Sequence, residues 1–162
     1  MTTLREQIAT TLPREAVFDY IADFQSAAEW DPGVAHARRL DAGPLRVGSS
    51  YELGVRMGGR VARMTYRITV LERPSRVVLE GEGSNVHAVD DIRFLPATAG
   101  TIVDYHADIR LQGWMRLLRP FLGGAIARIG RDAADGMTRT LAARAKTAVA
   151  GRVREPIAEV AG

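Results

Sequence analysis

Hydrophobic and polar positions along the chain repeat with two different periods, which divide it into three stretches. Residues 3–11 predict a first strand. From Pro13 to Phe24 apolar side chains recur at helical spacing, and Pro13 can open a helix because the first helical position needs no hydrogen-bond donor. A short helical segment follows in "SAAEW", and Trp30 then stands directly before Asp-Pro-Gly, a turn signal. The first stretch therefore predicts one strand followed by two short helices.

The middle stretch, from Val34 to Gln112, keeps a period of two. Within it, "SYELGVRM", "ARMTYRITV", "VHAVDDIRFLP" and "TIVDYHADIRLQG" each put apolar side chains on one face and mostly polar ones on the other. Gly58-Gly59, between the first two segments, indicates a two-residue hairpin. Such alternation is typical of an antiparallel sheet with one buried and one solvated face. We predict about six strands here.

The last stretch returns to a helical period from Trp114 to about Val149. Pro120 falls inside it, so a kink or a break is expected near Phe121. Together the three stretches predict an α+β fold, in which a curved antiparallel sheet of about seven strands wraps around one long C-terminal helix. Residues 1–150 are expected to form a single domain, and residues 151–162 a flexible tail.

Composition narrows the possible chemistry. The 162 residues are 46% hydrophobic and 25% charged, which is ordinary for a globular protein. There is no cysteine, and no two of the three histidines have the spacing of a helical metal pair, so we expect neither a metal nor another cofactor. The opening segment does not resemble a signal peptide and no run of about 18 apolar residues occurs, so we expect a cytoplasmic protein without a transmembrane segment.

The basic residues do not gather into one patch. The net charge is +3, and every basic residue except Lys146 is an arginine. Arginines alternate with acids along "YELGVRMGGRVARMTYRITVLERPSR", which favours a mixed solvated surface over a nucleic-acid interface. We therefore expect no nucleic-acid partner, and a monomer or homodimer.

Three segments together carry a family resemblance: "LPREAVFDYIADF…EWDPGV", "VGSSYEL", and "RFLPATAGTIVDYHADI" before a long helix. They resemble the START-like, Bet v 1-like (SRPBCC) superfamily, and more narrowly its bacterial polyketide cyclase/dehydrase and lipid-transport-like branch. The resemblance covers about residues 3–148 and implies a helix-grip domain with a cavity between the sheet and the helix. The matched positions are mostly structural: Pro13, Val17, Phe18, Asp23, Trp30, Gly48, Gly100 and Thr101.

The residues themselves also allow a cavity. A strongly curved sheet and one helix meet along a line, so space remains between them unless large side chains fill it. The predicted helix supplies small residues instead: Gly123, Gly124, Gly130, Ala133, Ala134 and Gly136. Glycine inside a helix costs about 0.5–1 kcal/mol relative to alanine. These residues indicate a cavity, a close approach of helix and sheet, or a break after Pro120.

Flexible methionines and amphipathic tyrosines on the predicted buried face suit a pocket that is mostly apolar with a few polar groups. The candidate ligand-binding residues are Trp30, Tyr51, Met57, Met64, Tyr66, Asp90, Ile92, Phe94, Tyr105, Phe121, Ile126, Gly130 and Met137. In the resembling fold the helix before Trp30 closes one end of the sheet groove. We interpret Trp30 mainly as a lid anchor, with ligand contact as the alternative.

Asp90 is the candidate catalytic residue, because we interpret it as the one ionisable group whose parity puts it on the buried face. Burial would raise its pKa unless it is paired, and such a carboxyl group can act as a general acid/base or hold a ligand. Two alternatives remain: a bulge near "VDD" turns Asp90 outward and Asp91 inward, or Asp90 sits at an open rim.

The histidines are weaker candidates. In "VAHARRLD" the parity is ambiguous, so either His36 and Arg38 face inward, or Ala35, Ala37 and Arg39 do. By parity, His87 and His106 lie on the solvated face.

Three functions fit this pattern. The preferred one is binding of a small hydrophobic ligand (lipid, polyketide or isoprenoid-like) in the cavity between the sheet and the C-terminal helix, because it needs only the cavity. The alternative is a polyketide aromatase/cyclase that catalyses aldol cyclisation and dehydration there, which also needs an acid/base group such as Asp90. The third, implied by the resemblance, is a coenzyme Q-binding or ribosome-associated partner module.

Overall fold

The computed structural model describes residues 1–153, without the side chains of residues 118–122 and 151–153. In chain order the elements are β1 (Thr2–Thr10), α1 (Arg14–Ala22), η1 (Phe24–Ser26), α2 (Ala27–Trp30), β2 (Val34–Arg39), β3 (Ser50–Met57), β4 (Arg60–Glu72), β5 (Arg76–Gly83), β6 (Val86–Ala97), β7 (Gly100–Leu111), η2 (Gly113–Leu118) and α3 (Arg119–Val153). The flexible tail predicted for 151–162 lies largely outside the described residues.

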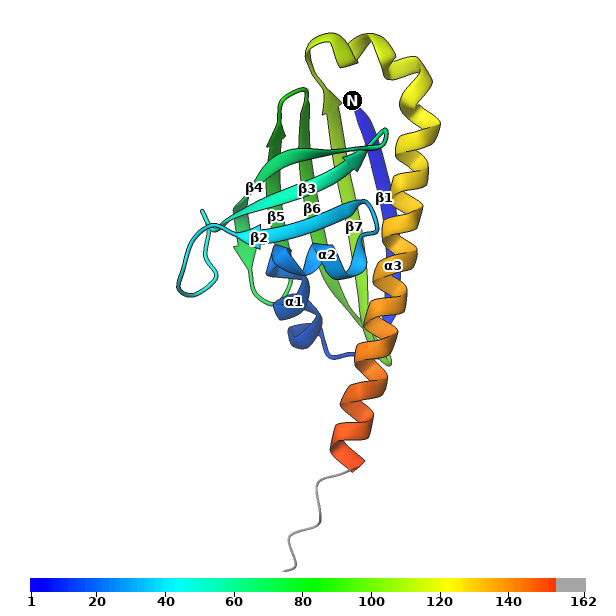
Figure 1. Cartoon of the computed structure of the whole chain (residues 1–162). Coiled ribbons are helices and arrows are strands. Elements are labelled where there is room, and N and C mark those ends of the chain that lie inside the picture. The colour runs from blue at the N-terminus through cyan, green and yellow to red at the C-terminus, as the bar shows by residue number, and fades with distance from the viewer. Residues whose placement is uncertain (154–162) are drawn as a thin grey trace, which may run out of the picture.

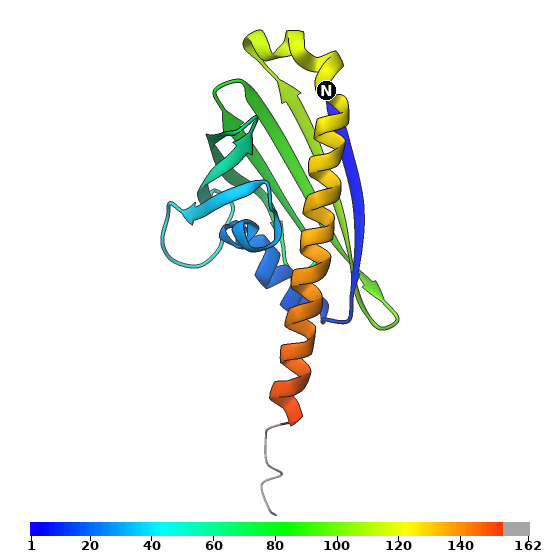
Figure 2. The same ribbon diagram turned by 45° about the vertical axis from the view of Figure 1, so that its right-hand side comes forward.

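The seven strands form one antiparallel sheet in the order β1-β7-β6-β5-β4-β3-β2 (Figure 1). The sheet is strongly curved, and α3 runs along its β1 edge, as the turned view in Figure 2 also shows. The predicted α+β helix-grip fold is confirmed, as is the hairpin at Gly58-Gly59. Met57 pairs with Arg60, and both glycines have positive φ, which a tight turn of this hand requires.

The short helices fill the lower part of the concave face (Figure 1). Phe18 of α1 packs edge-on against Phe94 of β6, with ring centroids 5.2 Å apart. The hydroxyl of Tyr51 on β3 lies 3.5 Å from the carbonyl oxygen of Ala22, at the end of α1. This part of the interior is therefore closed core, built by the amphipathic stripe that opens at Pro13.

The break predicted near Phe121 lies slightly earlier in the chain. The 3-10 helix η2 ends at Leu118 and α3 begins at Arg119. Pro120 therefore sits in the first turn of α3, where its missing N–H leaves no intrahelical bond unmade, and the helix continues from there without a second break. Among residues 1–153, no helix is long and apolar enough to cross a membrane.

The small residues of α3 divide into two groups. A Cβ added at Gly136 would overlap the carbonyl oxygen of Trp30, and one at Gly130 would lie 3.0 Å from a methyl group of Leu4. Gly123 and Gly124 instead have nothing within 4 Å of an added Cβ. Gly130 and Gly136 are therefore explained by the close approach of α3 to β1 and α2. For these two glycines, close packing, and not a cavity, is the reason for a small residue.

Candidate functional site

The space between the sheet and α3 is nearly filled. Beside Trp30 a void of about 10 Å³ remains, which is room for one water molecule at most. It is lined by Glu6, Ile8, Trp30, Tyr105, Gly130, Ala133, Ala134 and Met137. The expectation of an open, ligand-sized hollow at this place is not met, and the reason is the number of aromatic rings that converge there.

Those rings come from five elements. Phe24 of η1 packs against Tyr66 with centroids 5.1 Å apart, against Trp30 at 6.2 Å and against Tyr51 at 6.3 Å. Trp30 in turn lies 6.3 Å from the ring of Tyr105. The indole N–H of Trp30 donates to the hydroxyl oxygen of Ser26, one turn earlier, at 3.2 Å. Trp30 is thus a buried, hydrogen-bonded anchor whose ring also borders the remaining void.

Asp90 lies on the concave face, as its parity predicts. Its side chain is buried, and the hydroxyl of Tyr105 donates to its Oδ1 atom at 2.5 Å. Its Oδ2 atom is buried without a hydrogen-bond partner among the described residues. The bulge proposed near "VDD" is absent, because β6 pairs with β5 and β7 in unbroken register through Asp90 and Asp91.

The electrostatics of this group follow from its burial. Burial raises the pKa of Asp90 to about 7. The hydrogen bond from Tyr105 lowers this pKa and the negative charge of Asp31 raises it, but both effects are smaller than that of burial. Burial also raises the pKa of Tyr66 and of Tyr105 well above 10. Both phenols therefore stay protonated at neutral pH, and Asp90 is the group whose proton can be exchanged there.

Asp31 is a second carboxyl group at this end of the interior. It follows α2, and its Oδ1 atom accepts the backbone N–H of Gly33 at 2.7 Å. Burial raises the pKa of Asp31 despite that bond, and Asp132 of α3 raises it further. Sequence reasoning did not select Asp31, because a residue in an Asp-Pro-Gly turn is read as a turn former.

The structure brings only some of the predicted ligand-binding residues together. Trp30, Tyr105, Gly130 and Met137 line the void, and Asp90 and Tyr66 adjoin them through Tyr105 and Phe24. Tyr51, Ile92 and Phe94 are fully buried in the core. Met57 is half-buried and Met64 and Ile126 are buried, but none of the three lines the void. The side chain of Phe121 lies outside the described residues.

The ambiguous strand is resolved by its register. Ala37 pairs with Leu53 and Arg39 with Tyr51, so these two side chains share the concave face. His36 and Arg38 are exposed on the other face, which removes them as candidates. His87 and His106 also lie on that outer face, half-buried, where they contact Glu82 and Asp104.

Sequence reasoning missed Glu6, which lines the void from β1 opposite Tyr105. The signal was present, because a period of two puts Glu6 on the same face as Leu4 and Ile8. Among the described residues, no group of three or more histidine, aspartate or glutamate side chains could hold a metal ion.

A curved seven-stranded antiparallel sheet that holds a long C-terminal helix defines a START-like helix-grip protein. Solved structures of this class share the fold at low identity. An aromatase/cyclase, ZhuI, from Streptomyces sp. R1128 is 15% identical, with a TM-score of 0.69 over 86% of this chain and 92% of that chain. A START superfamily protein from Mycobacterium smegmatis is 11% identical, with a TM-score of 0.69 over 91% of this chain and 99% of that chain.

The family is identified from the sequence. The family described as "Polyketide cyclase / dehydrase and lipid transport" matches residues 1–155, so the chain belongs to it. No curated protein matches the chain significantly. Membership agrees with the resemblance that the three quoted segments and the long last helix indicated.

Proposed function

We propose that the protein binds a small hydrophobic molecule, of the lipid, polyketide or isoprenoid-like class, between the concave face of the sheet and α3. The observation that carries this proposal is the Oδ2 atom of Asp90, which is buried and unpartnered among apolar and aromatic side chains. A buried polar atom without a partner costs about 1–3 kcal/mol. A ligand that hydrogen-bonds this atom offsets that cost, and one directed polar group in apolar surroundings is the usual make-up of a small-molecule site.

The pairing chemistry defines the ligand's polar group. When Asp90 is ionised, Oδ2 accepts a hydrogen bond from a hydroxyl or amine; when it is protonated, the carboxyl group can donate to a carbonyl. A pKa of about 7 makes both forms accessible near neutral pH. The preferred ligand is therefore an apolar molecule with an isolated hydroxyl, amine or carbonyl group.

Binding requires the interior to open, because about 10 Å³ is far below the roughly 300–1,000 Å³ of ligand sites. We place the opening at the seam beside the void, where α3 faces β1 and Tyr105 of β7. The side chains that α3 contributes there are small or flexible: Gly130, Ala133, Ala134 and Met137. Methionine changes rotamer at little cost, so the side chain of Met137 can move aside to admit a ligand.

The neutral fluorescent probe N-phenyl-1-naphthylamine tests the site, since it is apolar and carries one N–H donor. We expect saturable binding by the wild type. Ala134→Phe places a ring in the seam and is expected to weaken binding at least tenfold, a loss of about 1.4 kcal/mol. Ala142→Phe is the matched control, because Ala142 is exposed on the same helix. Equal binding by both variants, or no saturable binding together with no co-purified molecule in native mass spectrometry, contradicts the proposal.

Aldol cyclisation with dehydration of a polyketide chain is the second candidate, and the Asp90–Tyr105 pair favours it. The Asp90 carboxylate would take a proton from the carbon between two carbonyl groups, and the resulting enolate would attack a distal carbonyl to form the C–C bond. The alkoxide would take a proton back, and loss of water would follow from the β-hydroxyl. A pKa of about 7 suits both proton transfers.

A linear poly-β-ketone thioester separates the two functions. If the second candidate holds, the wild type produces the cyclised aromatic product, and Asp90→Asn still binds the thioester but loses turnover by about 10²–10⁴-fold, the usual contribution of a general acid/base. Absence of product with wild-type protein that binds the thioester leaves binding as the function. Unchanged turnover in Asp90→Asn removes Asp90 from the chemistry.

A further inference from the structure

The end of the molecule where β7 passes into α3 exposes large apolar side chains. We call this the η2 corner: η2 with the end of β7 and the start of β1. Trp114 is 63% exposed and Leu117 is 79% exposed, the two highest values among the exposed large hydrophobic residues of the described chain. Exposed single apolar residues are common, but a tryptophan and a leucine exposed together on one short helix form an apolar patch, and such patches mark interaction sites.

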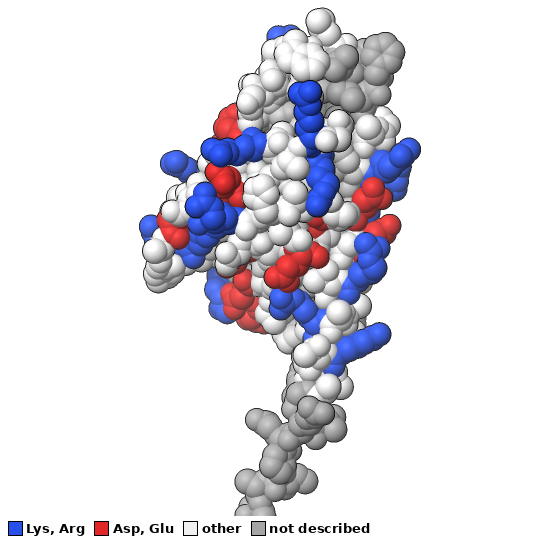
Figure 3. All heavy atoms as spheres, in the orientation of Figure 1, with Lys and Arg blue, Asp and Glu red and all other residues white. Residues whose placement is uncertain are grey.

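The same corner is basic. From Ile109 to Leu118, at the end of β7 and along η2, the sequence contains two arginines and no acidic residue. Arg110 and Arg116 are exposed. Two acids lie nearby: Asp108 accepts a hydrogen bond from Thr3 at 2.6 Å, and Glu82 contacts His87 at 3.3 Å. On the face shown in Figure 3, the uppermost described atoms are mostly white with a small blue group, and no red atoms are seen among them.

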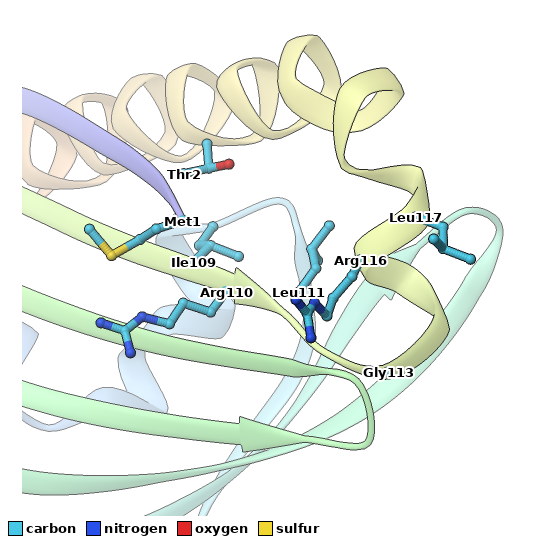
Figure 4. A pocket seen from close by; sticks show the side chains of 8 residues that line it. All are labelled: Met1, Thr2, Ile109, Arg110, Leu111, Gly113, Arg116 and Leu117. Carbon is cyan, nitrogen blue, oxygen red and sulfur yellow. The ribbon is translucent and has the colours of Figure 1, made fainter.

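An open hollow of about 650 Å³ lies at this corner (Figure 4). It is lined by Met1, Thr2, Ile109, Arg110, Leu111, Gly113, Arg116 and Leu117. The lining thus combines two arginine residues with four apolar ones, Met1, Ile109, Leu111 and Leu117. This combination accommodates a negatively charged head group beside hydrocarbon.

We propose that the η2 corner docks on a membrane surface that carries anionic phospholipid. Indole and leucine side chains insert at the boundary between head groups and acyl chains, while arginines bind phosphates and keep their own stems in the apolar layer. A nucleic acid would satisfy the arginines but would leave the side chain of Leu117 exposed to water, so the membrane accounts for both features.

Docking at this corner also positions the rest of the molecule. Leu111, Ile109, Ala107 and Tyr105 follow one another on the concave face of β7. At about 3.4 Å per residue, Tyr105 lies about 20 Å along the strand from Leu111. A bilayer at the η2 corner therefore meets the end of the apolar face that leads to Asp90. The docking proposal does not depend on the proposed function, because vesicle binding is measured without any interior ligand.

Vesicle co-sedimentation tests the proposal with the full chain. We expect binding to vesicles of phosphatidylcholine and phosphatidylglycerol in equal parts, weak binding to phosphatidylcholine alone, and loss of binding between about 0.05 M and about 0.5 M salt as the charges are screened. Arg110→Gln and Arg116→Gln are each expected to lower the affinity about fivefold. Trp114→Ala and Leu117→Ser are expected to lower it similarly.

Two control variants keep the test specific. Arg67→Gln removes an exposed arginine on the outer face of β4, and Val47→Ala removes an exposed apolar side chain between β2 and β3; neither is expected to change vesicle binding. Bromine-labelled lipid should quench the wild-type fluorescence and leave Trp114→Tyr unquenched, because the remaining indole, Trp30, is buried.

Several results would overturn the proposal. These are no binding to anionic vesicles, equal binding to neutral vesicles, and equal loss in the corner and control variants. A concentration-dependent dimer that dissociates in Trp114→Ala, measured by analytical ultracentrifugation in the absence of lipid, would instead assign the corner to a second copy of the chain.

Discussion

Asp90→Asn is expected to make the protein more stable than wild type at about pH 8, by about 2–4 kcal/mol, and to give no such gain at about pH 4. The pKa of Asp90 is raised to about 7 by burial, whereas in the unfolded chain it is ordinary. Between these values the folded protein holds a proton that the unfolded chain has lost. The contribution of Asp90 to wild-type stability therefore falls as pH rises from about 4 to about 7, and levels off above that.

Urea denaturation at a series of pH values measures this difference directly. Asparagine does not titrate and still accepts the hydrogen bond from Tyr105. The free energy of unfolding of Asp90→Asn should therefore change less with pH between about pH 4 and about pH 7 than that of the wild type. The matched control is Asp91→Asn, one residue along β6. Hydrogen bonds from Arg76 and Arg93 lower the pKa of Asp91 despite its partial burial, so this variant should lose stability at neutral pH, and the loss should fade in acid. Parallel wild-type and Asp90→Asn profiles would show that Asp90 is solvated.

Gly136→Ala is expected to destabilise the protein by about 2–4 kcal/mol, although alanine is the better helix former. The added Cβ would overlap the carbonyl oxygen of Trp30, which is backbone and cannot rotate away. α3 must therefore shift from α2. The contacts that hold it there include Arg144, which donates to Glu29 at 3.1 Å and lies 3.5 Å from the ring centroid of Tyr20.

Gly124→Ala is the matched substitution on the same helix. Nothing lies within 4 Å of its added Cβ, so helix propensity alone should act and the protein should gain about 0.5–1 kcal/mol. Thermal denaturation of both variants provides the comparison. A neutral or stabilising Gly136→Ala would mean that α3 is not held against the Trp30 backbone, and the close approach described here would be wrong.

The inward position of Asp90 could be predicted because it depends only on local geometry. Side chains alternate along any strand, and no bulge interrupts β6, so counting from Ile92 and Phe94 was sufficient. The same counting could not orient "VAHARRLD". There the register shifts between Val34 and His36, and a shift of one residue exchanges the two faces.

The sequence by itself determined the order of elements, the curved sheet around a last helix, the break next to Pro120 and the buried carboxyl group. All of these follow from periodicity or from the covalent properties of single residues. Only the tertiary structure decided how much space is left inside. That volume depends on the distances at which α2, α3 and the sheet come to rest, which are set by contacts between residues far apart in the chain, such as Gly136 with Trp30 and Phe24 with Tyr66. A pattern of small and aromatic residues is equally compatible with a hollow and with rings packed against one another, because packing density is a property of the assembled interior.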